Sequence, residues 1–386
     1  MDLQFTESEN AFREECRSWL EANVPPDSLP SGDTQDGYAL HLDWEHQLFD
    51  AGWAAVSWPK AYGGREATLF EWLIFEEEYY RVGAPSRVTQ NGIFLLAPTL
   101  FEFGTDEQKE RILRPMARGD VSWGQAWSEP NAGSDLASLK STARRVDGGW
   151  RLSGQKTWST RAVFCDMAYG LFRTDPEQVR HRGLTYFMFP LRAEGVTVRG
   201  VDRLDGDEGF AEIFLEDVFV PDTDIIGEVD QGWKVAMATT SSERGLSLRS
   251  PGRFMATASR LIDLYHRYRD RSDPVLRDQV IQAWMDAQVY RWFTFQTVTR
   301  MMQGESIGPD SSMNKVFWSE MDVRTHETAL AIIGEALELD EGSDSAVDAG
   351  HWMKGFQFAL AGPIYAGTNE IQRNIIAERV LGLPRK

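Results

Sequence analysis

The sequence predicts an α+β protein in which two helical domains flank a β domain, and three observations support this fold class. Apolar residues recur at helical spacing through residues 1–118. Short runs rich in strand-forming residues, separated by turn signals, occupy residues 119–228. Helical spacing returns over residues 229–386, and a chain of 386 residues is long enough for two or three packed domains. We therefore place the domain boundaries near residues 118 and 228.

The N-terminal domain is expected to consist of helices joined by turns. A turn at residues 58–64 precedes a helical run from about 67 to 81, and Thr105 with Gln108 forms a capping box that opens a helix at 106–117. In the first helix, apolar side chains recur at helical spacing between charged residues: Ala11, Phe12, Cys16, Trp19 and Leu20. We interpret the apolar faces of these helices as core.

The central domain shows one hairpin signal and three further strands. The hairpin is predicted from residues 142–146 and 150–153, which flank the turn sequence Asp-Gly-Gly. The further strand-like runs are residues 165–172, 184–191 and 210–220. No Gly-x-Gly-x-x-Gly sequence lies between a strand and a helix, so a Rossmann dinucleotide site is not predicted.

The C-terminal domain is expected to contain four helices joined by two irregular connections. The connections are residues 304–310 and 340–348. The helices are expected at roughly residues 231–270, 274–303, 311–335 and 350–379.

Composition excludes several classes of function. The formal charge of −19 argues against nucleic acid and anionic membranes as partners, although an anionic coenzyme needs only local donors. Cys16 and Cys165 provide neither a disulfide framework nor metal-ligand spacing, which fits a reducing cytoplasm. The first residues show no basic region followed by an apolar run, so no signal peptide is expected. No apolar stretch approaches the ~20 residues of a membrane span.

Residues 123–160 carry the densest set of candidate ligand-binding features. A turn is expected at Pro130, Asn131 and Gly133, because proline fixes φ while asparagine and glycine tolerate positive φ. Free N–H groups in such a turn form a concavity suited to phosphate. Hydroxyl groups and broad aromatic surfaces surround it, from Ser128, Ser134, Ser159, Thr160, Trp127 and Trp158. Taken alone, such a turn is typical of an ordinary polar loop.

Two motifs in this stretch raise its significance. The order Ser-Glu-Pro-x-Ala-Gly-Ser-Asp over residues 128–135, followed by Gly-x-Lys-x-Trp-x-Thr over 154–160, resembles the flavin-binding signature of the acyl-CoA dehydrogenase family. The resemblance covers nearly the whole chain and continues through residues 364–373 near the C-terminus. It implies an architecture whose C-terminal half is a four-helix bundle. It also implies oxidation of an acyl-CoA to a trans-2-enoyl-CoA, with FAD as cofactor and electron-transferring flavoprotein as acceptor.

The resemblance also assigns roles to individual residues. Ser128 and Thr160 would face the polar edge of the flavin, Trp158 would pack against its ring, and Gly133 and Ser134 would approach the pyrophosphate. The whole expected cofactor set is Gln125, Trp127, Ser128, Gly133, Ser134, Trp158, Thr160, Gly367, Thr368 and Glu370. Expected substrate contacts are Ser134, Arg244 and Tyr365.

The catalytic base is where the sequence departs from the commonest family pattern. Most members carry a glutamate between the Tyr and Gly of the C-terminal signature, and this chain has Ala366 there. Alanine cannot accept a proton, but its backbone N–H can still donate to the thioester oxygen. A second base position in the family precedes an arginine, and here it is Glu243 followed by Arg244. We predict that Glu243 is the base and that its apolar surroundings raise its pKa toward the working pH.

A further departure concerns the adenosine half of FAD, which the neighbouring subunit holds in the usual homotetramer. The expected Arg-x-x-Phe-Gly run is absent, although Arg269 and Arg271 lie at its place. Where a Gln-x-x-Gly-Gly run belongs, the chain has Ala331 and Glu335, and a carboxylate near a diphosphate costs roughly 1 kcal/mol or more. Alternatively, the alignment of this stretch with the family pattern is shifted, and Ala331 and Glu335 do not correspond to the Gln and Gly positions. We expect a tetramer, either of identical chains or an α2β2 assembly in which a paralogous subunit completes the site.

Three functional alternatives follow. The missing usual base and the weakened adenosine contacts resemble bacterial heteromeric dehydrogenases that act on steroid side-chain CoA thioesters. A flavin-dependent monooxygenase of the same fold would need no acyl-CoA base, and Glu243 with the Tyr365 to Thr368 signature argues against it. A non-catalytic subunit is the third alternative, and the intact segment from Ser128 to Thr160 argues against that.

Overall fold

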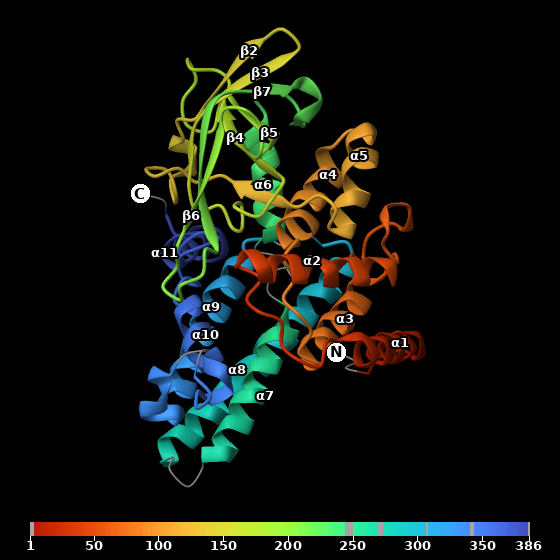
Figure 1. Ribbon diagram of the computed structural model, residues 1–386, viewed down its shortest axis with the longest axis vertical. Helices are drawn as coiled ribbons and strands as arrows, with labels where there is room; N and C mark the ends of the chain where they lie inside the picture. The colour runs from red at the N-terminus through yellow and green to blue at the C-terminus, as the bar shows by residue number, and fades with distance from the viewer. Residues whose placement is uncertain (1–3, 244–249, 269–272, 306–307, 340–342, 385–386) are drawn as a thin grey trace. The chain divides into compact units, whose positions relative to one another are not determined.

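The chain divides into two units that differ in secondary structure. The computed structural model describes residues 4–243, 250–268, 273–305, 308–339 and 343–384, without the side chains of residues 241–243. One unit, called here the helical unit, consists of Met1–Val24, Thr68–Ala84 and Arg244–Lys386. The other, the sheet unit, consists of Pro25–Ala67 and Pro85–Glu243. Helical segments at both ends of the chain and a central sheet confirm the predicted fold class (Figure 1).

The helical unit is built from helices that pack against one another. In it, α7 packs against α3, α8 and α9, while α9 also contacts α10 and α11. Its helices are α1 (Glu7–Asn23), α3 (Leu69–Arg81), α7 (Pro251–Tyr268), α8 (Pro274–Met302), α9 (Ser311–Ile333), α10 (His351–Ala359) and α11 (Asn369–Ile375). Between α1 and α3, Arg13 and Arg17 donate to the buried carboxylate of Glu78, which also accepts from Arg81. Burial would raise the pKa of Glu78, but these three arginines lower it to about 2.

The sheet unit contains one mixed eight-stranded sheet, ordered β6-β7-β3-β2-β4-β5-β8, with β1 paired to β4. The strands are β1 (Trp123–Ala126), β2 (Thr142–Val146), β3 (Gly149–Lys156), β4 (Met167–Arg173), β5 (Leu184–Pro190), β6 (Val196–Val201), β7 (Phe210–Pro221) and β8 (Ile225–Ile226). The predicted hairpin is confirmed, since β2 and β3 pair antiparallel and Val146 lies opposite Gly149. β1 and β4 run parallel, and this pairing fixes the start of the first signature segment.

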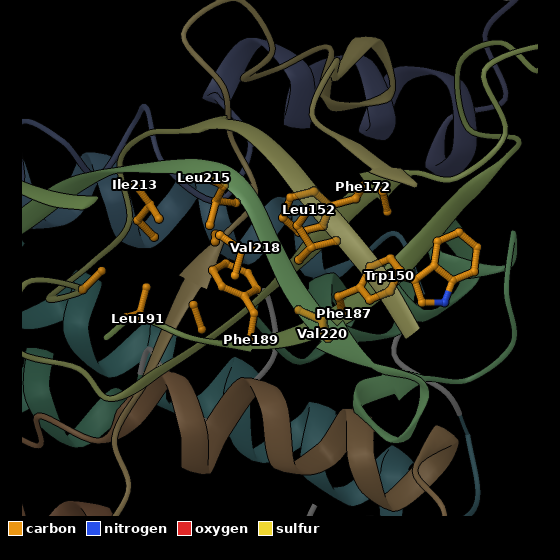
Figure 2. Close-up of a cluster of buried hydrophobic side chains, with 14 of the residues drawn as sticks. Trp150, Leu152, Phe172, Phe187, Phe189, Leu191, Ile213, Leu215, Val218 and Val220 are labelled. Carbon is orange, nitrogen blue, oxygen red and sulfur yellow. The ribbon is translucent and has the colours of Figure 1, made fainter. Parts of the chain in front are cut away.

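Alternating apolar residues of β3, β4, β5 and β7 form the core of the sheet unit. Figure 2 shows Trp150 and Leu152 beside Phe172, Phe187 and Phe189, with aliphatic side chains of β7 completing the cluster. All these side chains are buried, and burial of each large apolar side chain stabilises the fold by roughly 1.5–3 kcal/mol. The rings meet edge to face, as between Phe172 and Phe187 at 5.9 Å. This core gives the loops at the sheet a rigid base.

α-Helices make up much of the rest of the sheet unit. They are α2 (Gln35–Asp50), α4 (Ala97–Phe103), α5 (Asp106–Arg118) and α6 (Gly232–Glu243). The predicted capping box is confirmed, because Thr105 and Gln108 exchange hydrogen bonds at the start of α5. The amide of Gln108 also donates to the carbonyl oxygens of Thr223 and Ile225, which ties α5 to the end of the sheet. α6 contacts β5, and this contact orients the helix that carries Glu243.

Some predicted elements are wrong in detail. The single helix expected at 350–379 is two helices, α10 and α11, because Gly362 and Pro363 interrupt it and both Ala366 and Gly367 have positive φ. The helix expected at 231–270 is described as α6 and α7, and residues 244–249 between them lie outside the described residues. Short strands β1, β6 and β8 were not predicted. The three-domain boundaries stay a prediction.

Candidate active site

The first signature segment begins at the end of β1. In that strand Gln125 pairs with Tyr169 of β4. Directly after it, Glu129 and Ala132 exchange two backbone hydrogen bonds of 3.1 and 3.0 Å, which close the predicted turn. Gly133 and Ser134 follow in an exposed position, and a side chain at Gly133 would meet no atom within 4 Å. The backbone here is open to a ligand, as a phosphate-binding turn requires.

The second signature segment follows β3 and lies against the first. The backbone N–H of Thr157 donates to the carbonyl oxygen of Ser128 at 2.8 Å, so the structure joins the two motifs directly. Two residues later, Ser159 exchanges backbone hydrogen bonds of 3.0 Å each with Ala211 of β7. Thr160 accepts a 3.4 Å hydrogen bond from Asn91 at its carbonyl oxygen. Ser128, Trp158 and Thr160 are therefore brought together in one region of the sheet unit.

Trp158 presents its ring to the outside of the sheet unit. It is 61% exposed, and its ring meets the ring of Phe210 edge to face with centroids 5.9 Å apart. Its backbone has a φ of 59°, a left-handed conformation that side chains rarely adopt. A large exposed aromatic ring on a strained backbone gives the fold little packing energy. Such a ring offers a flat surface to a planar ligand.

A chain of hydroxyl groups connects Trp127 to helix α6. The indole N–H of Trp127 donates to the Tyr186 hydroxyl at 3.3 Å, and the two rings meet edge to face at 6.1 Å. The Tyr186 hydroxyl lies 3.2 Å from the Thr239 hydroxyl, which is 2.8 Å from that of Thr99. Thr239 is fully buried on α6, one turn before Glu243. This network fixes α6 with respect to the first signature segment within the same unit.

A buried ion pair that sequence reasoning missed holds the two motifs together. The Lys156 ammonium is fully buried and donates to the Glu129 carboxylate at 2.9 Å and to the Leu171 carbonyl at 2.8 Å. Glu129 also accepts from the backbone N–H groups of Lys140 and Ser141 at 2.6 and 2.8 Å. Burial would raise the pKa of Glu129, but Lys156 and these hydrogen bonds lower it. Burial lowers the pKa of Lys156 despite its partner. Both residues lie inside the signature motifs, which is the one sequence signal that pointed to them.

The C-terminal signature lies in the helical unit, on a turn before α11. Ala366 and Gly367 have φ values of 55° and 78°, and the side-chain amide of Gln372 donates to both of their carbonyl oxygens at 2.9 and 3.2 Å. The Thr368 hydroxyl caps α11 by accepting from the N–H of Ile371. Among the described residues, no hydrogen-bond acceptor faces the N–H of Ala366. The turn is therefore fixed through its carbonyl groups while that donor stays available.

Neighbouring side chains anchor the same turn. Lys315 is buried on α9 and donates to the Asn369 side chain at 2.8 Å. Tyr365 stacks on Trp318 with ring centroids 6.0 Å apart. Glu370 is exposed, and hydrogen bonds from its own backbone N–H and from Thr368 lower its pKa.

Several predicted site residues cannot be placed. Arg244, Arg269 and Arg271 lie outside the described residues, and of Glu243 only the backbone in α6 is described. Ala331 and Glu335 are described and exposed near the end of α9. In the described ranges, no group of His, Cys, Asp and Glu side chains is arranged to hold a metal ion. Across those ranges no helix meets the length and hydropathy of a membrane span.

The described residues of the sheet unit fit a flavin. They combine the exposed Trp158 ring, the open backbone at Gly133 and the half-buried hydroxyl groups of Ser128 and Thr160. Within the described part of the chain, the buried Ser159 hydroxyl has no hydrogen-bond partner. A planar ring system with a polar edge and a phosphate tail would use each of these features.

Comparison with known proteins identifies the family. Sequence models of the N-terminal, middle and C-terminal domains of acyl-CoA dehydrogenases match residues 6–120, 124–218 and 230–381. Acyl-CoA dehydrogenase IpdE1 of Mycolicibacterium smegmatis is 36% identical over 97% of this chain and 98% of its own. The chain belongs to the acyl-CoA dehydrogenase family. As a family member it is a flavoprotein oxidoreductase of the acyl-CoA dehydrogenase class.

Two solved structures resemble this dehydrogenase along its whole length. The Tcur3481-Tcur3483 steroid ACAD superposes with a TM-score of 0.90 at 26% identity and covers 100% of both chains. The ChsE4-ChsE5 complex from Mycobacterium tuberculosis gives a TM-score of 0.85 at 28% identity, again over 100% of both chains. This dehydrogenase therefore shares its fold, over its whole length, with a chain of each of these two structures.

Proposed function

We propose that this chain catalyses FAD-dependent α,β-dehydrogenation of an acyl-CoA thioester to a trans-2-enoyl-CoA, with Glu243 as the base that removes the α proton. A bound flavin would supply the acceptor for the β hydride. The observation that carries the proposal is Ala366, which occupies the usual base position with a side chain that cannot accept a proton.

The structure of α6 supports Glu243 as the replacement base. Glu243 follows Thr239 by four residues and so lies on the same face of the helix. Thr239 is linked through Tyr186 to Trp127, which adjoins Ser128 of the proposed flavin site. The helix face that includes position 243 is therefore held to the first signature segment inside one unit. A carboxylate beside an apolar acyl chain would have a raised pKa suited to proton abstraction.

Ala366 would still provide a backbone N–H that donates to the thioester oxygen. Its backbone N–H has no acceptor among the described residues, and Gln372 holds the turn by the two carbonyl groups. A fixed, unused N–H can stabilise the negative charge that develops on the thioester oxygen when the α proton leaves. Tyr365, Ser134 and Arg244 are proposed to contact the acyl-CoA.

The sheet unit would hold most of the flavin. Trp158 would cover the ring, Ser128 and Thr160 would bond its polar edge, and the turn at Gly133 and Ser134 would receive the pyrophosphate. The remaining proposed contacts are Gln125, Trp127, Gly367, Thr368 and Glu370.

We infer that the substrate is bulky, of the steroid side-chain type, and that a paralogous subunit completes an α2β2 tetramer. Support for both comes from the similarity to the steroid ACAD and to the ChsE4-ChsE5 complex. A second support is an exposed apolar stripe along α8, formed by Ile281, Trp284, Met285 and Val289, which indicates a surface that a partner chain covers. Ala331 and Glu335 would not hold a neighbour's adenosine, so the partner would provide those contacts.

The reduced flavin would pass its electrons to electron-transferring flavoprotein, by analogy with the family. We place the protein in the cytoplasm, and its two cysteines, Cys16 and Cys165, are buried free thiols as a reducing compartment favours.

Anaerobic titration of the purified flavoprotein with a panel of acyl-CoA thioesters tests the proposed reaction. Loss of the oxidised flavin absorbance on addition of a thioester, without oxygen, is the expected result. A flavin that stays oxidised with every thioester, yet consumes oxygen after chemical reduction, would instead establish the monooxygenase alternative.

The assembly is tested by expressing this chain alone and measuring its mass and flavin content in solution. We expect little bound flavin from the chain alone, and about two FAD per four chains once the partner is present. A stable homotetramer with one tightly bound FAD per chain would refute the heteromeric assembly.

A further inference from the structure

The chain is strained over residues 158–161, which include the proposed flavin-contacting residues Trp158 and Thr160 themselves. Trp158 and Arg161 have φ values of 59° and 55°, so two non-glycine residues within four positions are left-handed. Each such residue strains the backbone, because the Cβ atom approaches the carbonyl oxygen too closely in this region. Backbone hydrogen bonds from Ser159 to Ala211 and from Arg161 to Gly209 hold the segment against β7 and the loop before it. These bonds hold the segment in place, but they do not remove the strain of its left-handed residues.

A buried ion pair holds the same segment. The Nε of Arg161 donates to the Asp33 carboxylate at 2.5 Å, and both side chains are about nine-tenths buried at 12% and 10% exposure. Asp33 also binds Arg203, which in turn pairs with Asp205 at 2.8 Å and with Asp207 at 3.3 Å. Burial would raise the pKa of Asp33, but the two arginines lower it, so the carboxylate is charged at neutral pH. Asp33 therefore joins two loops of the sheet unit through one carboxylate.

Hydrogen bonding alone does not explain the position of Arg161. One terminal nitrogen, Nη1, is buried and has no hydrogen-bond partner among the residues that the structure describes. An unsatisfied buried donor destabilises the fold in addition to the backbone strain. A fold that needed only a link between these loops would be served better by a residue suited to positive φ, such as asparagine. Local cost of this kind is typical of segments whose shape serves a site.

We propose that Asp33 and Arg161 are positioning residues, which hold residues 158–161 in the conformation that presents Trp158 and Thr160 to the flavin. This inference rests on the flavin site proposed above. It brings the segment around Asp33, 128 positions away in the sequence, into the support of that site. Neither residue is proposed to touch the cofactor.

The test compares Asp33→Asn with Asp205→Asn in the holoprotein, purified with any subunit that accompanies it. Both substitutions remove one carboxylate from Arg203, but only the first removes the partner of Arg161. After removal of the flavin, FAD is titrated back, and the visible absorption of the bound flavin is recorded with the unfolding midpoint. We expect Asp33→Asn to weaken FAD binding about tenfold or more and to shift the flavin spectrum, because a displacement near 1 Å has effects of this size. Asp205→Asn should lower the unfolding midpoint and leave both flavin readouts unchanged.

Two further variants keep the proposal falsifiable if Asp33→Asn fails to fold. Arg161→Asn suits the left-handed backbone and lacks the guanidinium, so it should fold and still weaken FAD binding. The double variant of Asp33→Asn and Arg161→Asn should bind FAD no more weakly than the single variants, because both act through one pair. Wild-type FAD affinity and spectrum in Arg161→Asn, or equal losses in Asp33→Asn and Asp205→Asn, would overturn the inference while the flavin site stands. A wild-type protein that takes up no flavin would overturn the proposed function itself.

Discussion

In this dehydrogenase, different forces hold the flavin-edge segment of the sheet unit (residues 127–161) and the C-terminal turn of the helical unit (residues 365–376). The flavin-edge segment of the sheet unit depends on buried ion pairs, Glu129 with Lys156 on one side and Asp33 with Arg161 on the other. The C-terminal turn of the helical unit depends on the neutral amide of Gln372 and on the Thr368 cap of α11. Both segments contain left-handed, non-glycine residues, so both need external support.

The difference follows from the local structure on which each segment is built. A turn before a helix has the N-terminal groups of that helix nearby, and a cap with one amide satisfies the exposed backbone. Loops at the end of a strand lack such groups, so side chains must cross between loops to fix them. Charged side chains form strong cross-links, but a buried charge that loses its partner is costly. We therefore expect the sheet unit's segment to be more sensitive to substitution and to acid.

The largest effect is expected from Lys156→Met. The substitution leaves the Glu129 carboxylate buried without its cation, which should cost about 3–5 kcal/mol in unfolding free energy. Urea denaturation measures this loss. The matched control is Lys60→Met, because Lys60 pairs with Glu66 at the surface, where an ion pair contributes about 0–1 kcal/mol. Equal losses in the two variants would contradict the role given to the buried pair.

A smaller loss is expected from Gln372→Leu. Two hydrogen bonds to the carbonyl groups of the C-terminal turn disappear, but so does a buried side-chain oxygen that has no partner among the described residues. The net cost in unfolding free energy should be about 1–2 kcal/mol, and the rate of flavin reduction should fall as well. Gln282→Leu on the exposed face of α8 is the control. A Gln372→Leu protein with the stability and rate of that control would show that the amide does not hold the turn.

Acid should destabilise the flavin-edge segment more than the C-terminal turn, without any substitution. The folded-state pKa values of Glu129 and Asp33 are lowered, so their contribution to stability is complete above the unfolded-state pKa near 4 and is lost as the pH falls through the folded values. Hydrogen exchange at residues 127–161 should therefore become less protected below about pH 4. Residues 365–376 should lose less protection over the same range. Equal loss in both segments would remove the distinction.

The smallest effect is expected from Ala366→Gly. Glycine adopts a φ of 55° without strain, and relief of that strain outweighs the entropy cost of glycine by about 1 kcal/mol or less. The backbone N–H is retained, so flavin reduction by acyl-CoA should persist. Thermal unfolding together with the anaerobic assay measures both properties. A destabilised or inactive Ala366→Gly protein would argue against a role limited to the backbone at this position.

Local features of the fold were predictable from the sequence, and distant ones were not. The capping box at Thr105 and the hairpin at Asp147-Gly148 depend on neighbouring residues, and both form as predicted. β1 has four residues and pairs with β4, more than forty positions away, so no local period announces it. The break in the predicted helix at 350–379 had a signal in Pro363 that the apolar spacing concealed.

The same distinction applies to the candidate site. Motifs located Ser128, Trp158 and Thr160, and the hydrogen bond between Thr157 and Ser128 shows why the motifs belong together. The ion pairs that hold these residues were not predicted, because the sequence does not show that the side chains of Glu129 and Lys156 are buried against each other. The pairing of Asp33 with Arg161 depends entirely on tertiary structure. The motifs therefore located the proposed flavin contacts, whereas the side chains that support them could be found only in the structure.

Glu243→Gln tests the central claim most directly, because it keeps the shape of the side chain and removes its basicity. Anaerobic mixing with the best acyl-CoA substrate should show normal binding and a loss of flavin reduction of at least ~10²-fold. Glu228→Gln, an exposed glutamate ahead of α6, is the matched control and should react at the wild-type rate. Ala366→Glu added to the Glu243→Gln variant is expected to restore little activity. A near-wild-type rate of flavin reduction in Glu243→Gln would contradict the assignment of the base.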